Sequence, residues 1–105
     1  MAENLRLAVA GLSAVLAIAS LPSHAADITR GGQTYAMHCA MCHGPAGQGI
    51  QPGSPKFNRG ERMMQSDLAL LNSVRMGRGA MPGFMGVIRD RDILDVIAYI
   101  RTLQR

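Results

Sequence analysis

The pentapeptide Cys39-Ala40-Met41-Cys42-His43 contains both cysteines of this 105-residue chain. Two residues separate the thiols, and an imidazole follows the second thiol directly. A disulfide between Cys39 and Cys42 would close a very small loop, so it would stabilise the fold little and would suggest thiol redox catalysis instead. A zinc site needs four ligands, and the chain has no second cysteine pair to complete one.

A third interpretation, covalent attachment of a c-type haem, uses every functional side chain of the motif. Each thiol adds across one vinyl group of the porphyrin, and the two intervening residues set the separation of the sulfurs. His43 then lies beside the porphyrin and supplies an imidazole nitrogen to the iron. Because each of the three side chains makes a different bond at the required offset, the sequence predicts one covalent haem c held by Cys39, Cys42 and His43.

The second axial ligand of such an iron has to come from elsewhere in the chain, and the sequence favours Met81. His38 directly precedes the motif and is too constrained to reach the opposite haem face. Met81 lies in the segment 77–84, whose Gly and Pro residues predict a loop, and Pro82 stiffens the backbone beside it. A thioether is an established partner of histidine at haem iron. The alternatives are Met85, Met76 and the pair Met63 and Met64.

Residues 1–25 differ in composition from the rest of the chain. Sixteen of these 25 residues are apolar, against 34 of the other 80. An apolar run over residues 7–21 ends at Pro22, and Ser23-His24-Ala25 places small residues at the positions that a signal peptidase requires. The alternative is a membrane anchor, but a spanning helix needs about 20 apolar residues. The sequence therefore predicts a secretory signal peptide cleaved after Ala25.

The remaining part, residues 26–105, has room for one small domain. The whole chain carries 11 Lys and Arg against 7 Asp and Glu, and its aromatic content is 4% with no Trp. These values exclude a multidomain enzyme, a collagen-like repeat and an acidic disordered tail. The scarcity of aromatic residues is consistent with a core that a haem completes.

Three segments together resemble the small class I cytochromes c of bacteria: the Cys-x-x-Cys-His motif, the segment 79–84 (Gly-Ala-Met-Pro-Gly-Phe) and the C-terminal pattern 96–100 (Val-Ile-Ala-Tyr-Ile). The resemblance covers about residues 27–103. It implies an all-α cytochrome c fold wrapped around one haem, with His43 and Met81 as axial ligands and electron transfer as the function.

The same resemblance implies two structural roles. In the family, a Gly followed three residues later by an aromatic marks the crossing of the first and last helices, and Gly32 and Tyr35 match this pattern, with Tyr99 as the partner on the last helix. A proline carbonyl in the loop after the motif accepts the Nδ1 proton of the ligand histidine, which fixes the ring. Pro55 is the first choice for that role and Pro52 the alternative.

Periodicity and capping residues predict three helices and no strands. Asp27 caps the first, which runs to about Met37; Ser66 and Asp67 begin the second, which ends at Gly77; and Asp90 caps the last. Residues 44–58 are expected to form a loop. The expected core residues are Leu68, Leu70, Leu71 and Val74 in the middle helix, and Ile93, Val96, Ile97, Ile100 and Leu103 in the last.

Two protein ligands leave the iron no open position, so the sequence predicts a soluble periplasmic one-electron carrier that cycles between Fe(III) and Fe(II), and not an enzyme. The alternative is a small haem subunit or sensor with a displaceable Met ligand that serves one enzyme complex. Redox partners are expected to dock weakly at the exposed haem edge of a monomer, with no nucleic acid and no stable membrane insertion after cleavage. Four arginines lie near the expected haem rim: Arg59, Arg62, Arg75 and Arg78. They would steer an acidic partner or pair with the haem propionates, and the equal alternative is that their charge serves only general solubility.

Overall fold

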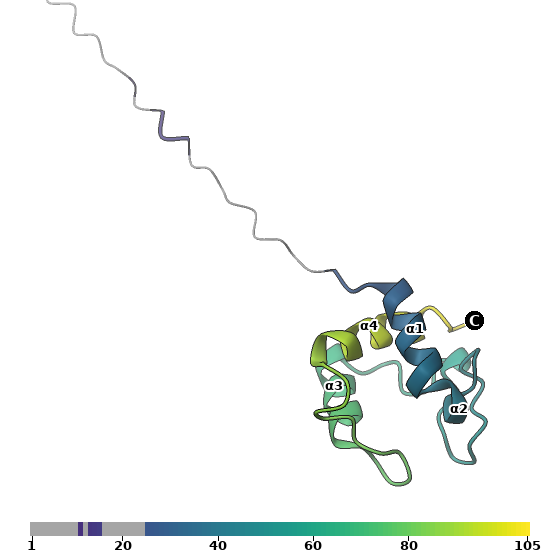
Figure 1. Cartoon of the computed structure of the whole chain (residues 1–105). Coiled ribbons are helices and arrows are strands. Elements are labelled where there is room, and N and C mark those ends of the chain that lie inside the picture. The colour runs from purple at the N-terminus through teal and green to yellow at the C-terminus, as the bar shows by residue number, and fades with distance from the viewer. Residues whose placement is uncertain (1–10, 12, 16–24) are drawn as a thin grey trace, which may run out of the picture.

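The computed structural model describes residues 11, 13–15 and 25–105. The predicted signal peptide therefore lies almost wholly outside the described residues. The described part is helical and confirms the all-α prediction, with one isolated bridge between Arg78 and Met81 as its extended pairing (Figure 1). Its elements are α1 (Ile28–His38), α2 (Ala40–His43), the 3-10 helix η1 (Phe57–Arg59), α3 (Asp67–Met76) and α4 (Asp90–Arg101).

The first two predicted caps are present. The Asp27 side chain accepts a hydrogen bond from the Arg30 backbone N–H at 2.9 Å, and the Ser66 hydroxyl accepts one from the Ala69 N–H at 3.2 Å. Each bond satisfies a backbone donor that the first turn of a helix leaves without a partner. Gly77 ends α3 with a φ of 76°, a conformation that favours glycine.

The predicted cap of α4 is wrong. Arg89, which has an extended backbone, takes the cap position, and Asp90 is the first residue inside the helix. A capping side chain has to stand on the extended residue before the helix, and the Asp90 carboxylate is instead held by Arg75 Nε at 3.3 Å. Arg89 pairs with Asp92 at 2.8 Å within the first turn of α4.

The core forms where α1 and α3 pack against α4. Figure 1 shows α1 crossing α4, with α3 on one side of the crossing and α2 on the other. The predicted α4 residues are buried or partly buried as expected, and Tyr35, Ile93 and Ile97 are the most deeply buried side chains of the described chain.

Leu68 corrects the prediction for the middle helix, because its side chain is 73% exposed. Leu70 and Leu71 are buried and Val74 packs against them. At about 100° per residue these three share one arc of the helix, and Leu68 falls outside it. The prediction placed Leu68 in the core because it lies three residues before Leu71. The buried side of the helix is instead the arc that carries Leu70, Leu71 and Val74.

The crossing of α1 and α4 depends on two consecutive glycines. A Cβ atom on Gly32 would lie 3.0 Å from the Tyr99 ring, which confirms the predicted partner, and the Tyr35 and Tyr99 rings lie 5.3 Å apart. The closer backbone approach is at Gly31, where a Cβ atom would collide with the carbonyl oxygen of Asp95. The sequence prediction chose Gly32 and missed the tighter contact at Gly31.

Candidate haem site

His43 is the last residue of the one-turn helix α2, and its side chain is buried. Its imidazole stacks on the Phe57 ring, with centroids 4.7 Å apart and planes 21° from parallel. The next residue, Gly44, has a φ of 85°, and its carbonyl accepts a hydrogen bond from the Tyr35 hydroxyl at 2.6 Å. The core residue Tyr35 thus fixes the backbone directly after the histidine.

The loop after α2 folds back onto the end of that helix. The Gly49 N–H donates to the His43 carbonyl at 2.7 Å, and the Ile50 and Gln51 N–H groups donate to the Cys42 carbonyl at 3.0 and 2.8 Å. These bonds satisfy carbonyls that the end of a helix would otherwise leave free. The motif is therefore held by backbone contacts on both sides, although α2 is only four residues long.

The imidazole of His43 has an unpartnered polar atom. Its Nδ1 is buried and makes no hydrogen bond of ordinary geometry. Burial lowers the pKa of His43, and the backbone carbonyl of Pro55 opposes this by raising it. The Pro55 carbonyl is therefore close to the ring although it falls short of a complete hydrogen bond, whereas Pro52 lies exposed in the loop. The neutral imidazole favoured here is the form that binds a metal.

Cys39 is half-buried and Cys42 is exposed, and both are free thiols. Burial, together with the nearby Cys42, raises the pKa of Cys39 to about 11. A thiol redox centre needs a lowered pKa, because the thiolate is the nucleophile. The arrangement therefore disfavours the redox interpretation. For the zinc interpretation, no group of three or more His, Cys, Asp or Glu side chains gathers anywhere in the described residues.

Met81 stands at the end of a tight turn. The Arg78 N–H donates to the Met81 carbonyl at 3.0 Å, and the Met81 N–H donates to the Arg78 carbonyl at 2.9 Å. Beyond it, the Phe84 and Met85 N–H groups donate to carbonyls of Val74 and Arg75 in α3, at 3.0 and 3.1 Å. The predicted loop is present, and backbone bonds anchor it to the end of α3.

Two glycines, Gly77 and Gly83, let the Met81 loop pack closely against the end of α3. A Cβ atom on Gly77 would lie 2.5 Å from the Gly83 nitrogen and 2.7 Å from the Met81 carbonyl oxygen. A Cβ atom on Gly83 would lie 2.7 Å from the Arg75 carbonyl oxygen. Since such distances are shorter than real contacts allow, neither position accepts a larger residue without moving the Met81 backbone.

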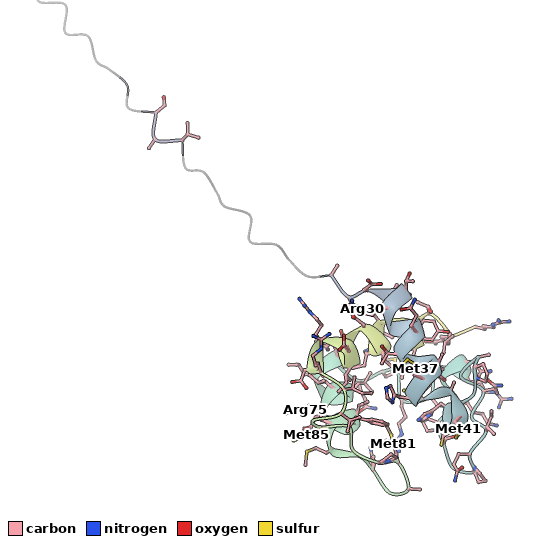
Figure 2. All side chains as sticks on the ribbon, viewed as in Figure 1. Arg30, Met37, Met41, Arg75, Met81 and Met85 are labelled. Carbon is pink, nitrogen blue, oxygen red and sulfur yellow. The ribbon has the colours of Figure 1, made fainter. Side chains whose placement is uncertain are left out.

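Exposure separates Met81 from the alternative ligands. Met81 is half-buried, whereas Met85, Met76 and Met64 are 55%, 63% and 99% exposed. Met63 is buried, but it belongs to the hydrophobic core together with Phe57 and Leu70. Figure 2 shows Met81 on the part of the loop toward α2 and Met85 on the other side. Met81 is thus the candidate that is neither solvent-exposed nor part of the helical core.

The four arginines of the expected rim differ in their surroundings. Arg59, Arg62 and Arg78 are exposed. Arg75 is partly buried and forms the ion pair with Asp90 that ties the end of α3 to the start of α4. The sequence suggested that Arg75 steers a partner or binds a haem propionate. In the structure its guanidinium pairs with Asp90 of the same chain.

Several supporting residues were missed by the sequence analysis. Phe57 stacks on the histidine, the Tyr35 hydroxyl bonds to the Gly44 carbonyl, and Gly77 and Gly83 set the position of the Met81 turn. The available signal was local: an aromatic two residues after Pro55, and two glycines flanking the Met-Pro pair. Neither signal says which backbone these residues contact.

Two free thiols at the Cys-x-x-Cys spacing, a buried neutral histidine beside them with an unpartnered Nδ1, and a half-buried thioether on a rigid loop fit the donor set of a covalent haem. An all-α fold with this donor set defines the class of c-type cytochromes.

Comparisons with known proteins place the chain in the same class. A family model described as cytochrome c oxidase, cbb3-type, subunit III matches residues 26–100. Cytochrome c6 of Picosynechococcus sp. is 32% identical, over 95% of this chain and 92% of that protein. Cytochrome c6 of Thermosynechococcus vestitus is 31% identical, over 90% of this chain and 87% of that protein.

Solved structures show the same fold. Cytochrome c6 from the diatom Phaeodactylum tricornutum has a TM-score of 0.60 and 27% identity, covering 72% of this chain and 92% of that one. The KustC0563 c-type cytochrome has a TM-score of 0.66 at 22% identity, covering 71% of this chain and 98% of that one. The chain therefore belongs to the small monohaem class I c-type cytochromes, and it is an electron carrier with one covalent haem c.

Proposed function

We propose that this chain is a periplasmic one-electron carrier in which Cys39 and Cys42 form the thioether bonds and His43 and Met81 are the axial ligands. The observation that carries the assignment is the pairing of a buried, neutral His43 with a backbone-anchored Met81 loop. The haem, when bound, supplies an iron that gains and loses one electron.

The residues of the chain limit how much the site rearranges during that change. Phe57 stacks on the His43 ring and holds its plane, and the nearby Pro55 carbonyl would accept the Nδ1 proton after a small adjustment of the loop. Backbone bonds at Arg78, Val74 and Arg75 hold the Met81 loop. A thioether ligand favours the ferrous state and raises the potential relative to two histidines.

This arrangement supports a carrier without enzymatic activity of its own. With an imidazole and a thioether both supplied by the protein, the iron keeps no position for substrate. The alternative, a small haem subunit or sensor with a displaceable Met, needs a loop that opens easily. The bonds and close glycine contacts around Met81 favour the carrier.

Location and partners complete the proposal. Removal of residues 1–25 would leave an 80-residue monomer in the periplasm, where redox partners dock briefly at the exposed haem edge. The exposed Arg59, Arg62 and Arg78 would favour an acidic partner surface. Within the described residues, no helix is both long and apolar enough to cross a membrane.

The test is to export the full chain from a bacterium with active haem c maturation and to isolate the periplasmic protein. We expect an intact mass equal to residues 26–105 plus one haem, a reversible one-electron spectral change, and no rapid CO binding by the ferrous form. A chain without added haem mass would overturn the cofactor sites. Immediate CO binding would overturn the carrier and favour the displaceable-Met alternative.

A further inference from the structure

Asp95 lies in the middle of α4 and is only 5% exposed. Its carboxylate accepts one hydrogen bond from the described residues, from the Asp27 backbone N–H to Oδ1 at 2.8 Å. The ion pairs of the described chain join other residues, and none of them reaches Asp95. A buried carboxylate with no cation at ion-pair distance is costly to the fold.

The same carboxylate lines a pocket at the start of α1. The chain that precedes the helix contributes Ala25 and Ala26 to this pocket, α3 contributes Asp67, and α4 contributes Asp95. Ala25 and Ala26 are exposed and not part of a helix, so the peptide bond between them is accessible. This bond is also the predicted cleavage position.

Covalent geometry limits how far the Ala26 nitrogen can lie from the Asp95 carboxylate. Standard bond lengths keep consecutive backbone nitrogens within about 3.7 Å of each other. Because the Asp27 nitrogen lies 2.8 Å from Asp95 Oδ1, the nitrogen one residue earlier lies at most about 6.5 Å from that oxygen, and Ala26 lines the same pocket as Asp95. In the uncleaved chain this nitrogen is a neutral amide.

We propose that cleavage after Ala25 creates an α-ammonium group on Ala26 that Asp95 binds, so that export completes the charge pairing of the α1 and α4 crossing. Hydrolysis of the Ala25–Ala26 bond by signal peptidase consumes one water, and leaves a carboxylate on Ala25 and an ammonium on Ala26. The inference rests on the proposed cleavage and is independent of the haem ligands.

The other charges around this nitrogen come from all three packed helices. Arg30 of α1 and Arg91 of α4 line the pocket, Asp27 caps α1 with its side chain, and Asp67 of α3 is paired with Arg101. The positive end of the α1 dipole disfavours a cation there. Asp95 is the buried carboxylate that offsets this effect and holds the ammonium.

The test measures the pKa of the Ala26 α-amine in the holoprotein by NMR, after intact mass has established that the chain begins at Ala26. An ordinary α-amine has a pKa of about 7.7–8.0, and we expect a rise of at least about one unit. The pairing then stabilises the fold below about pH 8 and is lost as the pH rises through the higher folded value.

Two altered chains isolate the pairing, and a third is the control. Asp95→Asn should return the α-amine pKa to its ordinary range, whereas Asp92→Asn, a matched change at a carboxylate paired with Arg89 on the same helix, should leave it raised. Insertion of Gly-Ser between Ala25 and Ala26 moves the ammonium away while Asp95 stays in place. It should lower the melting temperature at pH 7 but not at pH 10.5.

An ordinary α-amine pKa in the native chain, or equal melting temperatures for the native and extended chains at pH 7, would overturn the inference. A mass that shows a different first residue would overturn it as well. If Asp95→Asn does not fold, the extended chain still decides the question. The haem spectrum of each variant reports separately on the proposed function, since none of the three changes alters Cys39, Cys42, His43 or Met81.

Discussion

His43 and Met81 are held by different means. The histidine is buried and stacked on Phe57, so its ring orientation comes from side-chain packing. Met81 is half-buried, and its position comes from backbone hydrogen bonds and from two glycines that allow close approach. Changes at these residues are therefore expected to have separable effects on ligation and on stability.

Met81→Ala is expected to abolish the sulfur-to-iron charge-transfer band of the ferric holoprotein, because no other half-buried thioether lies on this loop. Met85→Ala is the matched control on the same loop, and its 55% exposed side chain should be dispensable. The measurement is the near-infrared edge of the absorption spectrum. A band that persists in Met81→Ala would show that another residue binds the iron.

Tyr35→Phe is expected to lower the free energy of unfolding by about 1–2 kcal/mol, because it removes a buried hydrogen bond to the Gly44 carbonyl. Burial, with smaller effects of Cys39 and Tyr99, raises the pKa of Tyr35 above its ordinary value. The unfolded tyrosine therefore ionises first, and its contribution to stability is present below about pH 10 and falls above it.

Denaturant unfolding of the holoprotein at pH 7 and pH 10.5 measures both effects. The native chain should lose more stability between these two values than Tyr35→Phe does. Tyr99→Phe is the control, since it removes a hydroxyl from the neighbouring ring without touching the Gly44 bond. Equal losses in the native chain and in Tyr35→Phe would contradict the assignment.

At the scale of the elements, the packing of α1 on α4 depends on the absence of two side chains. Gly31 faces a backbone carbonyl of α4, whereas Gly32 faces the ring of Tyr99. A backbone carbonyl inside a helix cannot move alone, but an aromatic ring at the edge of the core can shift. The two positions therefore differ in what they tolerate.

Gly31→Ala is expected to destabilise the holoprotein by about 2–3 kcal/mol more than Gly32→Ala, because the new Cβ atom would force α1 and α4 apart. At Gly32 the contact with Tyr99 is partly offset by the higher helix propensity of alanine, which contributes about 1 kcal/mol. Thermal unfolding of both variants, followed by far-UV circular dichroism, gives the comparison. Similar melting temperatures would place the critical contact elsewhere.

At the scale of the whole molecule, a small core has to support four α-helices, one 3-10 helix and the loops between them. The buried hydrophobic residues of the described chain number ten, and many large apolar side chains are exposed, Ile50 and Val87 among them. Chains of this size usually need a covalent or cofactor staple. Covalent haem supplies that staple here.

The double variant Cys39→Ser and Cys42→Ser, which has no thiol for attachment, is therefore expected to be largely unfolded. Its far-UV circular dichroism should show most of the helical signal lost, and its amide resonances should be poorly dispersed. The native holoprotein is the reference. A cooperative unfolding transition with full helicity in the haem-free variant would show that the core suffices without the cofactor.

Much of this molecule follows from local sequence, because the responsible interactions are local. The Cys-x-x-Cys-His spacing, the caps at Asp27 and Ser66, and the periodicity of α4 involve residues within a few positions of each other. Hydrogen bonds and helical arcs at that range are set by the chain itself. The haem motif, the all-α class and the Met81 loop were predictable for this reason.

Only the tertiary structure decided the contacts between distant segments. It placed Gly31 rather than Gly32 against the α4 backbone, gave Asp90 to Arg75 instead of the helix cap, left Leu68 exposed, and favoured Pro55 over Pro52 beside His43. In two of these cases the competing residues, Gly31 with Gly32 and Pro55 with Pro52, are of the same type and lie within three positions of each other, so local sequence does not separate them. What separates them is which surface the crossing of α1, α3 and α4 covers, and that depends on the packing of the whole chain.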